Sequence, residues 1–314
     1  MKSTARAVRI TPHLLKRLPL PRVDEGGDKE ERGRVLFVGG SREMPGAVVL
    51  ASLAALRAGA GKLRVATATS AAPLVAGQVF EARVYTVAET KAGDIAAAAA
   101  RRLGECAEGA RAICVGPGMI DEKGAARLVR KLLASKPRAM LVLDANALAG
   151  LRDSRRLVRG LERGAVLTPN GDELGGLLGD DPPRRAGTVK TSAGAKNPSV
   201  EAADAALRIA DEYGAVAVVK GRETFIAAPG GELYVNRAGN VGLATSGSGD
   251  VLAGVVAGLA ARGAGALAAA VWGVHAHALA GERLAERVGR LGYLARELLD
   301  EIPRVLEDLA ARAK

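Results

Sequence analysis

Cysteine and aromatic residues are scarce in this sequence, and each shortage excludes a class of protein. Cys106 and Cys114 are the only 2 cysteines among 314 residues, which excludes a disulfide-stapled scaffold and predicts a reducing compartment, the cytoplasm. Two buried thiols explain the pair better than a disulfide does. Aromatic residues make up 3% of the chain, which leaves few stacking platforms for single-stranded nucleic acid.

Targeting and membrane-spanning segments are also missing from the pattern. Residues 1–30 carry charges throughout and show no apolar stretch followed by a small-residue cleavage site, so we expect no secretory signal. The longest apolar region, residues 251–281, is interrupted by Arg262, His275 and His277. Buried helices explain this region better than a membrane span does, and we expect no membrane association.

What the chain has in excess is positive charge and glycine. It carries 45 Lys and Arg against 34 Asp and Glu, a formal net charge of +11, which makes nucleic acid a partner to consider. Its 40 glycines lie in clustered turns without the every-third-residue period of collagen. With 48% hydrophobic residues, the chain has the composition of a globular enzyme.

Short apolar segments alternate with helical patterns along most of the chain, which predicts an α/β fold with a mostly parallel sheet covered by helices on both faces. Because ligands bind at the carboxyl ends of such strands, we expect the chemistry along the edge from Gly39 to Lys220. The expected strands are residues 34–38, 63–67, 113–115, 140–143, 165–167 and 216–219, with a hairpin at 225–228 and 233–235. The expected helices include residues 47–58, 125–134 and 202–213.

Two segments stand apart from this pattern. Residues 1–32 are expected to form an N-terminal arm, in which Thr11 and Pro12 start a short helix before a charged linker. Residues 33–314 are expected to form one domain. Within it, residues 179–200 are rich in Pro, Gly, Lys and Arg without periodicity, and they predict a long surface loop. As a hypothesis, this loop closes over phosphates through Arg184, Arg185, Lys190 and Lys196.

The strongest chemical signal is the turn at residues 240–250, Asn-Val-Gly-Leu-Ala-Thr-Ser-Gly-Ser-Gly-Asp, before an apolar helix from Val251. Its small residues allow the backbone to close around an anion, and the helix start points free N–H groups at the same place. Asp250 can serve there as the general base for a hydroxyl that faces a phosphoryl group. The alternative is a helix-capping aspartate, the commoner role of a Gly-Asp pair.

Familiar phosphate and metal motifs do not compete with this turn. The only Gly-Lys pair, Gly61-Lys62, is followed by Leu63, so a Walker A loop is excluded. No Gly-x-Gly sequence carries the third glycine of the dinucleotide fingerprint. His275 and His277 lie two apart on a helix and so on different faces, which argues against a metal site. Lys220, at a strand end before a glycine, is either a solvated cation or a phosphate ligand.

Residues 240–254, with the core Ala-Thr-Ser-Gly-Ser-Gly-Asp-Val-Leu-Ala-Gly, resemble the signature of the ADP- or ATP-dependent NAD(P)H-hydrate dehydratases, a branch of the ribokinase-like superfamily. Further blocks resemble the family in order and spacing, and the resemblance covers about residues 11–310. These blocks are residues 39–41, 46–47, 54–61, 116–118, 143–148 and 167–170, Glu173, and residues 220–224.

The resemblance implies a three-layer α/β/α ribokinase-like fold and a metabolite-repair lyase. Members dehydrate the S epimer of hydrated NADH or NADPH and spend ADP or ATP, so that the added hydroxyl leaves as phosphate and AMP or ADP is released. Mg²⁺ would arrive with the nucleotide phosphates. The resemblance also implies a homo-oligomer, with a tetramer as one form, and a dehydratase without a fused epimerase domain, the epimerase being a separate protein.

The resemblance also implies roles for particular residues. Asp250 would be catalytic and would contact both the nucleotide and the hydrated dinucleotide. The substrate contacts would be Ala47, Gly118, Asn170 and Glu173. The nucleotide-binding residues would be Lys220, Gly221, Arg222, Glu223, Thr224, Asn240, Thr245, Ser246, Gly247, Ser248 and Gly249. Asn170 stands where many bacterial members carry His, and Asn146 stands where Asp is common, so Asn146 is not assigned to metal.

Two other function classes remain open at this stage. A small-molecule kinase of the same fold, acting on a sugar or a vitamin-precursor alcohol, would share Asp250 and the anion-binding turn. A basic nucleic-acid-binding protein is supported by the net charge alone, because no base-reading motif is present. The Thr168-Pro169-Asn170 turn and the block at residues 39–41 favour the dehydratase over the kinase.

Overall fold

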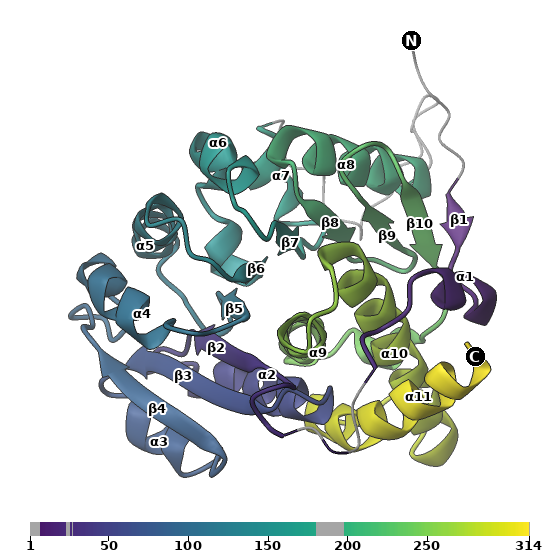
Figure 1. Ribbon diagram of the computed structural model, residues 1–314, viewed down its shortest axis with the longest axis horizontal. Coiled ribbons are helices and arrows are strands. Elements are labelled where there is room, and N and C mark those ends of the chain that lie inside the picture. The colour runs from purple at the N-terminus through teal and green to yellow at the C-terminus, as the bar shows by residue number, and fades with distance from the viewer. Residues whose placement is uncertain (1–6, 23–25, 27, 180–197, 314) are drawn as a thin grey trace.

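A single β-sheet organises the chain in the computed structural model (Figure 1). The structure describes residues 7–22, 26, 28–179 and 198–313, and within them the sheet has 10 strands. The predicted loop closure through Arg184, Arg185, Lys190 and Lys196 lies outside the described residues. The strands are β1 (Val8–Arg9), β2 (Arg34–Val38), β3 (Lys62–Ala68), β4 (Ala82–Val87), β5 (Ala112–Val115), β6 (Met140–Leu143), β7 (Ala165–Leu167), β8 (Val216–Val219), β9 (Thr224–Ala227) and β10 (Leu233–Asn236).

The strand order is β1-β10-β9-β8-β7-β6-β5-β2-β3-β4. Strand β9 runs antiparallel to both β8 and β10, and the pairs between the other described neighbours are parallel. The prediction of a mostly parallel α/β sheet is confirmed. Every strand predicted from an apolar run is present, with ends that differ by a residue or two.

Helices cover both faces of the sheet, because successive strand residues point to opposite sides. Val35 and Phe37 of β2 face one core, whereas Leu36 and Val38 face the other. The first core is covered by α1 (Pro12–Arg17), α2 (Pro45–Arg57), α3 (Ala72–Ala76), α9 (Ser248–Ala261), α10 (Ala266–Arg287) and α11 (Leu298–Arg312). The second is covered by α4 (Ala100–Cys106), α5 (Glu122–Ala134), α6 (Arg155–Arg159), α7 (Leu174–Leu178) and α8 (Pro198–Tyr213).

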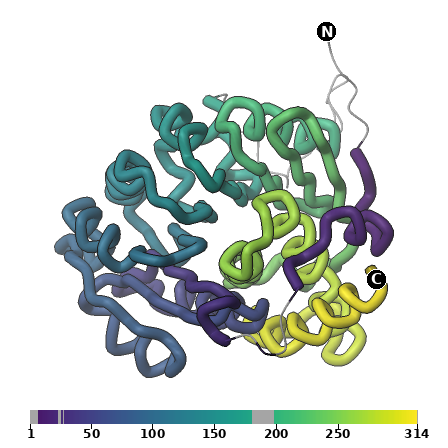
Figure 2. The backbone as a smooth tube through the Cα atoms, in the orientation of Figure 1, coloured from purple at the N-terminus to yellow at the C-terminus, as the bar shows by residue number. Residues whose placement is uncertain are grey.

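The N-terminal arm docks against the domain through its own short elements. Thr11 Oγ1 accepts a hydrogen bond from the Leu14 N–H and so caps α1, while β1 adds an edge strand beside β10. Trp272 Nε1 donates to the Leu18 carbonyl over 2.7 Å. Figure 2 shows the arm lying beside α11, near the other end of the chain.

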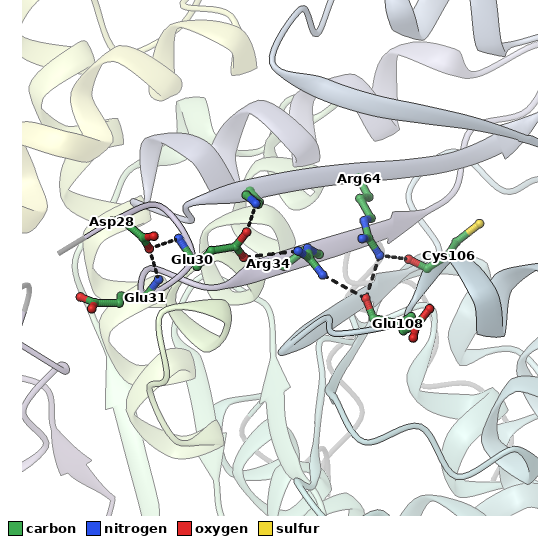
Figure 3. A network of polar contacts seen from close by, with 8 residues as sticks. Asp28, Glu30, Glu31, Arg34, Arg64, Cys106 and Glu108 are labelled. Atoms are coloured by element: carbon green, nitrogen blue, oxygen red, sulfur yellow. Dashed lines mark hydrogen bonds and ion pairs between the residues drawn. The ribbon is translucent and has the colours of Figure 1, made fainter.

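A polar network ties the turn before β2 to the amino ends of the strands (Figure 3). Glu30 forms ion pairs with Arg34 and Lys62. Arg34 and Arg64 both donate to the Glu108 carbonyl, over 3.2 and 2.8 Å. These basic side chains therefore act in structural contacts, at the edge of the sheet opposite the carboxyl ends of the parallel strands.

The apolar region at residues 251–281 belongs to two buried helices, α9 and α10, as the sequence predicts. Gly263, with φ +100°, lies between them. In the described part of the chain no helix is long and apolar enough to cross a membrane.

Helices α2 and α9 approach each other at the level of their backbones. A Cβ added to Gly258 would lie 2.6 Å from the Ala55 carbonyl oxygen, and one added to Gly254 would overlap the Ala51 carbonyl oxygen. Both glycines lie inside a helix, where glycine lowers helix propensity. Close packing, and not backbone conformation, therefore requires them.

We predict that Gly254→Ala lowers the free energy of unfolding by about 1–3 kcal/mol, because the methyl group overpacks a rigid contact. Chemical denaturation at constant m-value measures the change. The matched control is Gly104→Ala in α4, where an added Cβ would meet no atom within 4 Å; it should be neutral or stabilising by up to about 1 kcal/mol. Equal effects of the two substitutions would contradict the packing argument.

Candidate active site

Three neighbouring strands place polar side chains at the same edge of the sheet. Asp144 follows β6, Thr168 follows β7 and Lys220 follows β8, and β8, β7 and β6 are adjacent. The hydrogen bonds between neighbouring strands continue past the strand ends. The Asp144 N–H donates to the Val115 carbonyl and the Thr168 N–H to the Leu143 carbonyl, each over 3.1 Å. Residues far apart in the sequence thus meet at the predicted edge.

The side chains of Asp144 and Lys220 form a partly buried charge pair. Asp144 Oδ1 accepts one hydrogen bond from Thr168 Oγ1 and another from Lys220 Nζ, each 2.7 Å long. The side chain of Asp144 is 4% exposed and that of Lys220 is 19% exposed. Lys220 is therefore not a solvated surface cation. Sequence reasoning missed Asp144 and Thr168 as site residues, although Asp144 directly follows an apolar strand.

The glycine turn lies against this pair. Helix α9 begins at Ser248 and not at Val251, which corrects the predicted start, and its N-cap is Gly247 with φ +89°. Asp250 thus occupies the first turn, whereas the N-cap residue is Gly247, so Asp250 is not the N-cap residue. A Cβ on Gly249 would lie 3.6 Å from Lys220 Nζ, which places the ammonium beside the positive helix end.

The buried environment changes the acidity of the site. Burial is the largest cause that raises the pKa of Asp250, to about 7, with the charge of Asp144 next and Lys220 acting against them. Burial also raises the pKa of Glu173, which Lys220 opposes. Burial works to lower the pKa of Lys220, but Asp144 and Glu173 outweigh it and the pKa is raised. A carboxylate that titrates near neutral pH suits a general base.

Ala47 and Gly118, predicted to contact substrate, lie next to each other. A Cβ on Gly118, which has φ +74°, would be 3.2 Å from the Ala47 Cβ and 3.1 Å from the Gly40 Cα. Buried Asp94 fixes the turn that follows Gly118, because its Oδ2 accepts the N–H groups of Ile120 and Asp121, over 2.7 and 2.6 Å. Gly40, Ala47 and Gly118 therefore form a surface of small residues. The carboxylate of Asp94 holds the backbone that follows Gly118 in place.

The predicted substrate turn is closed by its own side chains. Asn170 Oδ1 accepts the N–H groups of Asp172 and Glu173, and Glu173 Oε2 accepts the Asn170 N–H over 2.7 Å. Asn170 thus builds the turn that carries Glu173, whose carboxyl group is close enough to Lys220 for the ammonium charge to act on its pKa.

Other predicted nucleotide-binding residues differ in their contacts and exposure. Asn240 uses its side chain to hold its loop: Nδ2 donates to the Gly281 carbonyl, and Oδ1 accepts from Tyr293. Glu223 pairs with Arg237 over 2.6 Å. Gly221, Arg222 and Ser246 are exposed, whereas Thr224 and Thr245 are half-buried.

The two helix histidines have separate partners. His277 Nε2 lies 3.1 Å from Ser248 Oγ, at the start of α9, and His275 Nδ1 lies 2.9 Å from Asn236 Oδ1. Burial lowers the pKa of both to about 4, so both are neutral at neutral pH. The contact between His277 and Ser248 was not predicted from the sequence.

Comparison with known proteins relates the chain to one enzyme family. A family model described as NAD(P)H-hydrate dehydratase matches residues 35–304. The ADP-dependent (S)-NAD(P)H-hydrate dehydratase of Xanthomonas campestris is 46% identical over 302 residues, which cover 96% of each chain.

Solved structures show the same relationship. The ADP/ATP-dependent NAD(P)H-hydrate dehydratase of Bacillus subtilis, co-crystallised with ATP and Mg²⁺, matches with a TM-score of 0.77 and 27% identity, over 96% of this chain and 99% of the other. A ribokinase-like superfamily protein of Enterococcus faecalis has a TM-score of 0.77 at 24% identity, over 97% and 96% of the two chains. The expected three-layer ribokinase-like fold is confirmed.

We predict that Asp250→Asn stabilises the protein at pH 8 by about 1–3 kcal/mol, because it removes a charge that burial disfavours. The pKa of Asp250 is about 7 in the folded chain against an ordinary value of 3.8, so the folded chain binds an extra proton between these pH values. The stability cost of Asp250 is complete above pH 7 and disappears below about pH 4. Unfolding free energies at pH 8 and pH 4 measure it; an equal gain at both would contradict the assignment.

Proposed function

The chain belongs to the NAD(P)H-hydrate dehydratase family, and on that premise we propose that it is a hydro-lyase that repairs hydrated NADH and NADPH. The reaction dehydrates the S epimer with ADP or ATP as co-substrate and releases phosphate and AMP or ADP. The observation that carries the proposal is Asp250, a half-buried carboxylate with a pKa of about 7, at the helix start beside Lys220.

The first step of the reaction makes a leaving group. Hydroxide leaves poorly, so the hydroxyl oxygen of the hydrate attacks the terminal phosphoryl group while Asp250 takes the hydroxyl proton. The P–O bond to the rest of the nucleotide breaks, and AMP or ADP leaves. The product of this step is a phosphate ester of the hydrate.

The second step restores the nicotinamide. The ring nitrogen supplies electrons, the C–O bond to the phosphate breaks, and loss of a ring proton re-forms the double bond. Lys220 and the amide groups at Gly249 and Asp250 bind the phosphoryl oxygens in both steps, since they are fixed donors at a helix start. Ala47 and Gly118, with the turn from Asn170 to Glu173, are the surfaces proposed for the hydrated dinucleotide.

Mg²⁺ fits this site as a partner of the nucleotide. Among the described residues no group of three or more His, Cys, Asp or Glu side chains is arranged to hold a metal ion, and the Asp144 carboxylate already pairs with Lys220. The phosphate oxygens are therefore the proposed ligands, and the ion supplies charge neutralisation there. Homo-oligomer formation and a separate epimerase remain predictions.

A small-molecule kinase would use the same base and the same anion-binding turn. The fold alone does not separate the two functions. The full-length match to dehydratases, at 46% identity for the Xanthomonas relative, favours dehydration. A nucleic-acid-binding role has no support beyond the net charge of +11.

We predict that incubation with (S)-hydrated NADH and ADP or ATP restores the absorbance of NADH, with one phosphate released per NADH formed. Asp250→Asn should lower kcat by about 10²–10⁴-fold, the usual contribution of a general base. Asp204→Asn, on the exposed side of α8, is the matched control and should keep full activity. Phosphorylation of an alcohol by a chain that leaves hydrated NADH unchanged would establish the kinase instead.

A further inference from the structure

Asp144 contacts Lys220, the proposed phosphate ligand, and its charge acts on Asp250, the proposed base, yet neither the family resemblance nor the sequence gave it a role. We propose that Asp144 is the positioning residue of this site: it anchors the Lys220 ammonium at the glycine turn and supplies the negative charge beside which Asp250 takes up its proton. This inference rests on the proposed function, because both of its effects act on residues of that reaction.

The geometry of Asp144 is that of an anchor. One oxygen, Oδ1, accepts hydrogen bonds from both the Thr168 hydroxyl and the Lys220 ammonium, each over 2.7 Å. The Thr168 hydroxyl thus orients the carboxylate that holds the Lys220 ammonium. The residue is 3% exposed. The next residue, Ala145, has φ +49°, a conformation disfavoured for alanine that tends to occur at functional sites.

Lys220 depends on this anchor for its place. A buried ammonium needs a charged partner, and Asp144 is the carboxylate that contacts it directly. The alternative partner, Glu173, uses Oε2 to accept the Asn170 N–H in its own turn. Asp144 therefore holds Nζ close to Gly249, where a transferred phosphoryl group would lie.

The negative charge of Asp144 also helps to raise the pKa of Asp250. Burial raises the pKa of Asp250 most, and Asp144 is the next cause, followed by the opposing charge of Lys220 and a smaller contribution from Glu173. On the α10 side, His277 is neutral at working pH, because burial lowers its pKa to about 4. Loss of the Asp144 charge would release Lys220 to pair with Asp250, and both changes lower the pKa of Asp250.

The first test is the pH profile of Asp144→Asn, an almost isosteric change that removes the charge. We expect the acid limb of kcat/KM to move to lower pH by roughly one unit. We also expect the nucleotide KM to rise about tenfold or more, the effect of losing a charge-assisted hydrogen bond. A merely structural role would lower activity without moving the limb, and an unmoved limb would overturn the proposal.

A double substitution separates the two effects of Asp144. If Asp144 acts on the nucleotide through Lys220, adding Asp144→Asn to Lys220→Gln should leave the nucleotide KM nearly unchanged from that of Lys220→Gln alone. The acid limb should still move. Additive effects on the nucleotide KM would overturn the anchoring role.

Thr168→Val keeps the proposal testable if Asp144→Asn does not fold. It removes the neutral donor from Oδ1 and keeps both charges, so the nucleotide KM should rise a few-fold while the acid limb stays in place. An unchanged KM, or a limb that moves to lower pH, would contradict the proposed arrangement.

A direct titration distinguishes failure of this inference from failure of the proposed function. In protein labelled with ¹³C at the aspartate carboxyl groups, the Asp250 signal is identified by its loss in Asp250→Asn. Its midpoint should lie near pH 7 in the unsubstituted chain and lower in Asp144→Asn, whether or not hydrated NADH is a substrate. If the chain is an active dehydratase and Asp144→Asn leaves the Asp250 midpoint unchanged, this inference is overturned and the proposed function is not.

Discussion

The ion pair between Asp144 and Lys220 connects the fold to the chemistry. It joins the ends of β6 and β8 across β7. Asp144 Oδ1 accepts hydrogen bonds from the Lys220 ammonium and from the Thr168 hydroxyl, each over 2.7 Å. Buried ion pairs add little to stability compared with packed apolar residues, because both charges lose their hydration. We therefore infer that the pair holds the two charges in place and adds little to the stability of the fold.

The sheet was predictable where both of its faces are buried. Strands such as β5 and β6 are apolar at every position because helices cover them on both sides. Strand β4 was missed because it is an edge strand: Arg83 and Thr86 are exposed, so no apolar run marks it. Strand β1 has 2 residues, and its pairing with β10 depends on chain folding that no local pattern encodes.

The site was predictable where its residues form a local motif. Asp250 follows a glycine turn and precedes an apolar helix, and Lys220 ends a strand before a glycine, so each is visible within a few residues. The contacts between Lys220 and Asp144 and between His277 and Ser248 span 76 and 29 residues. Their side chains meet only because the strand order brings them together, and a polar residue after an apolar strand was the one local sign of Asp144.

The local charge of the site opposes the net charge of the chain. The chain carries +11, yet the carboxylates of Asp144, Glu173 and Asp250 gather around the ammonium of Lys220. A polyanionic nucleotide would be repelled if all of them remained ionised. In the proposed reaction, proton uptake would neutralise Asp250 as a phosphoryl group moves toward the substrate oxygen. A base that becomes neutral at that point would no longer repel Asp144, Glu173 and the phosphates. In the proposed reaction, the burial and the neighbouring carboxylate that favour protonation of Asp250 would therefore also lower the electrostatic barrier to phosphoryl transfer.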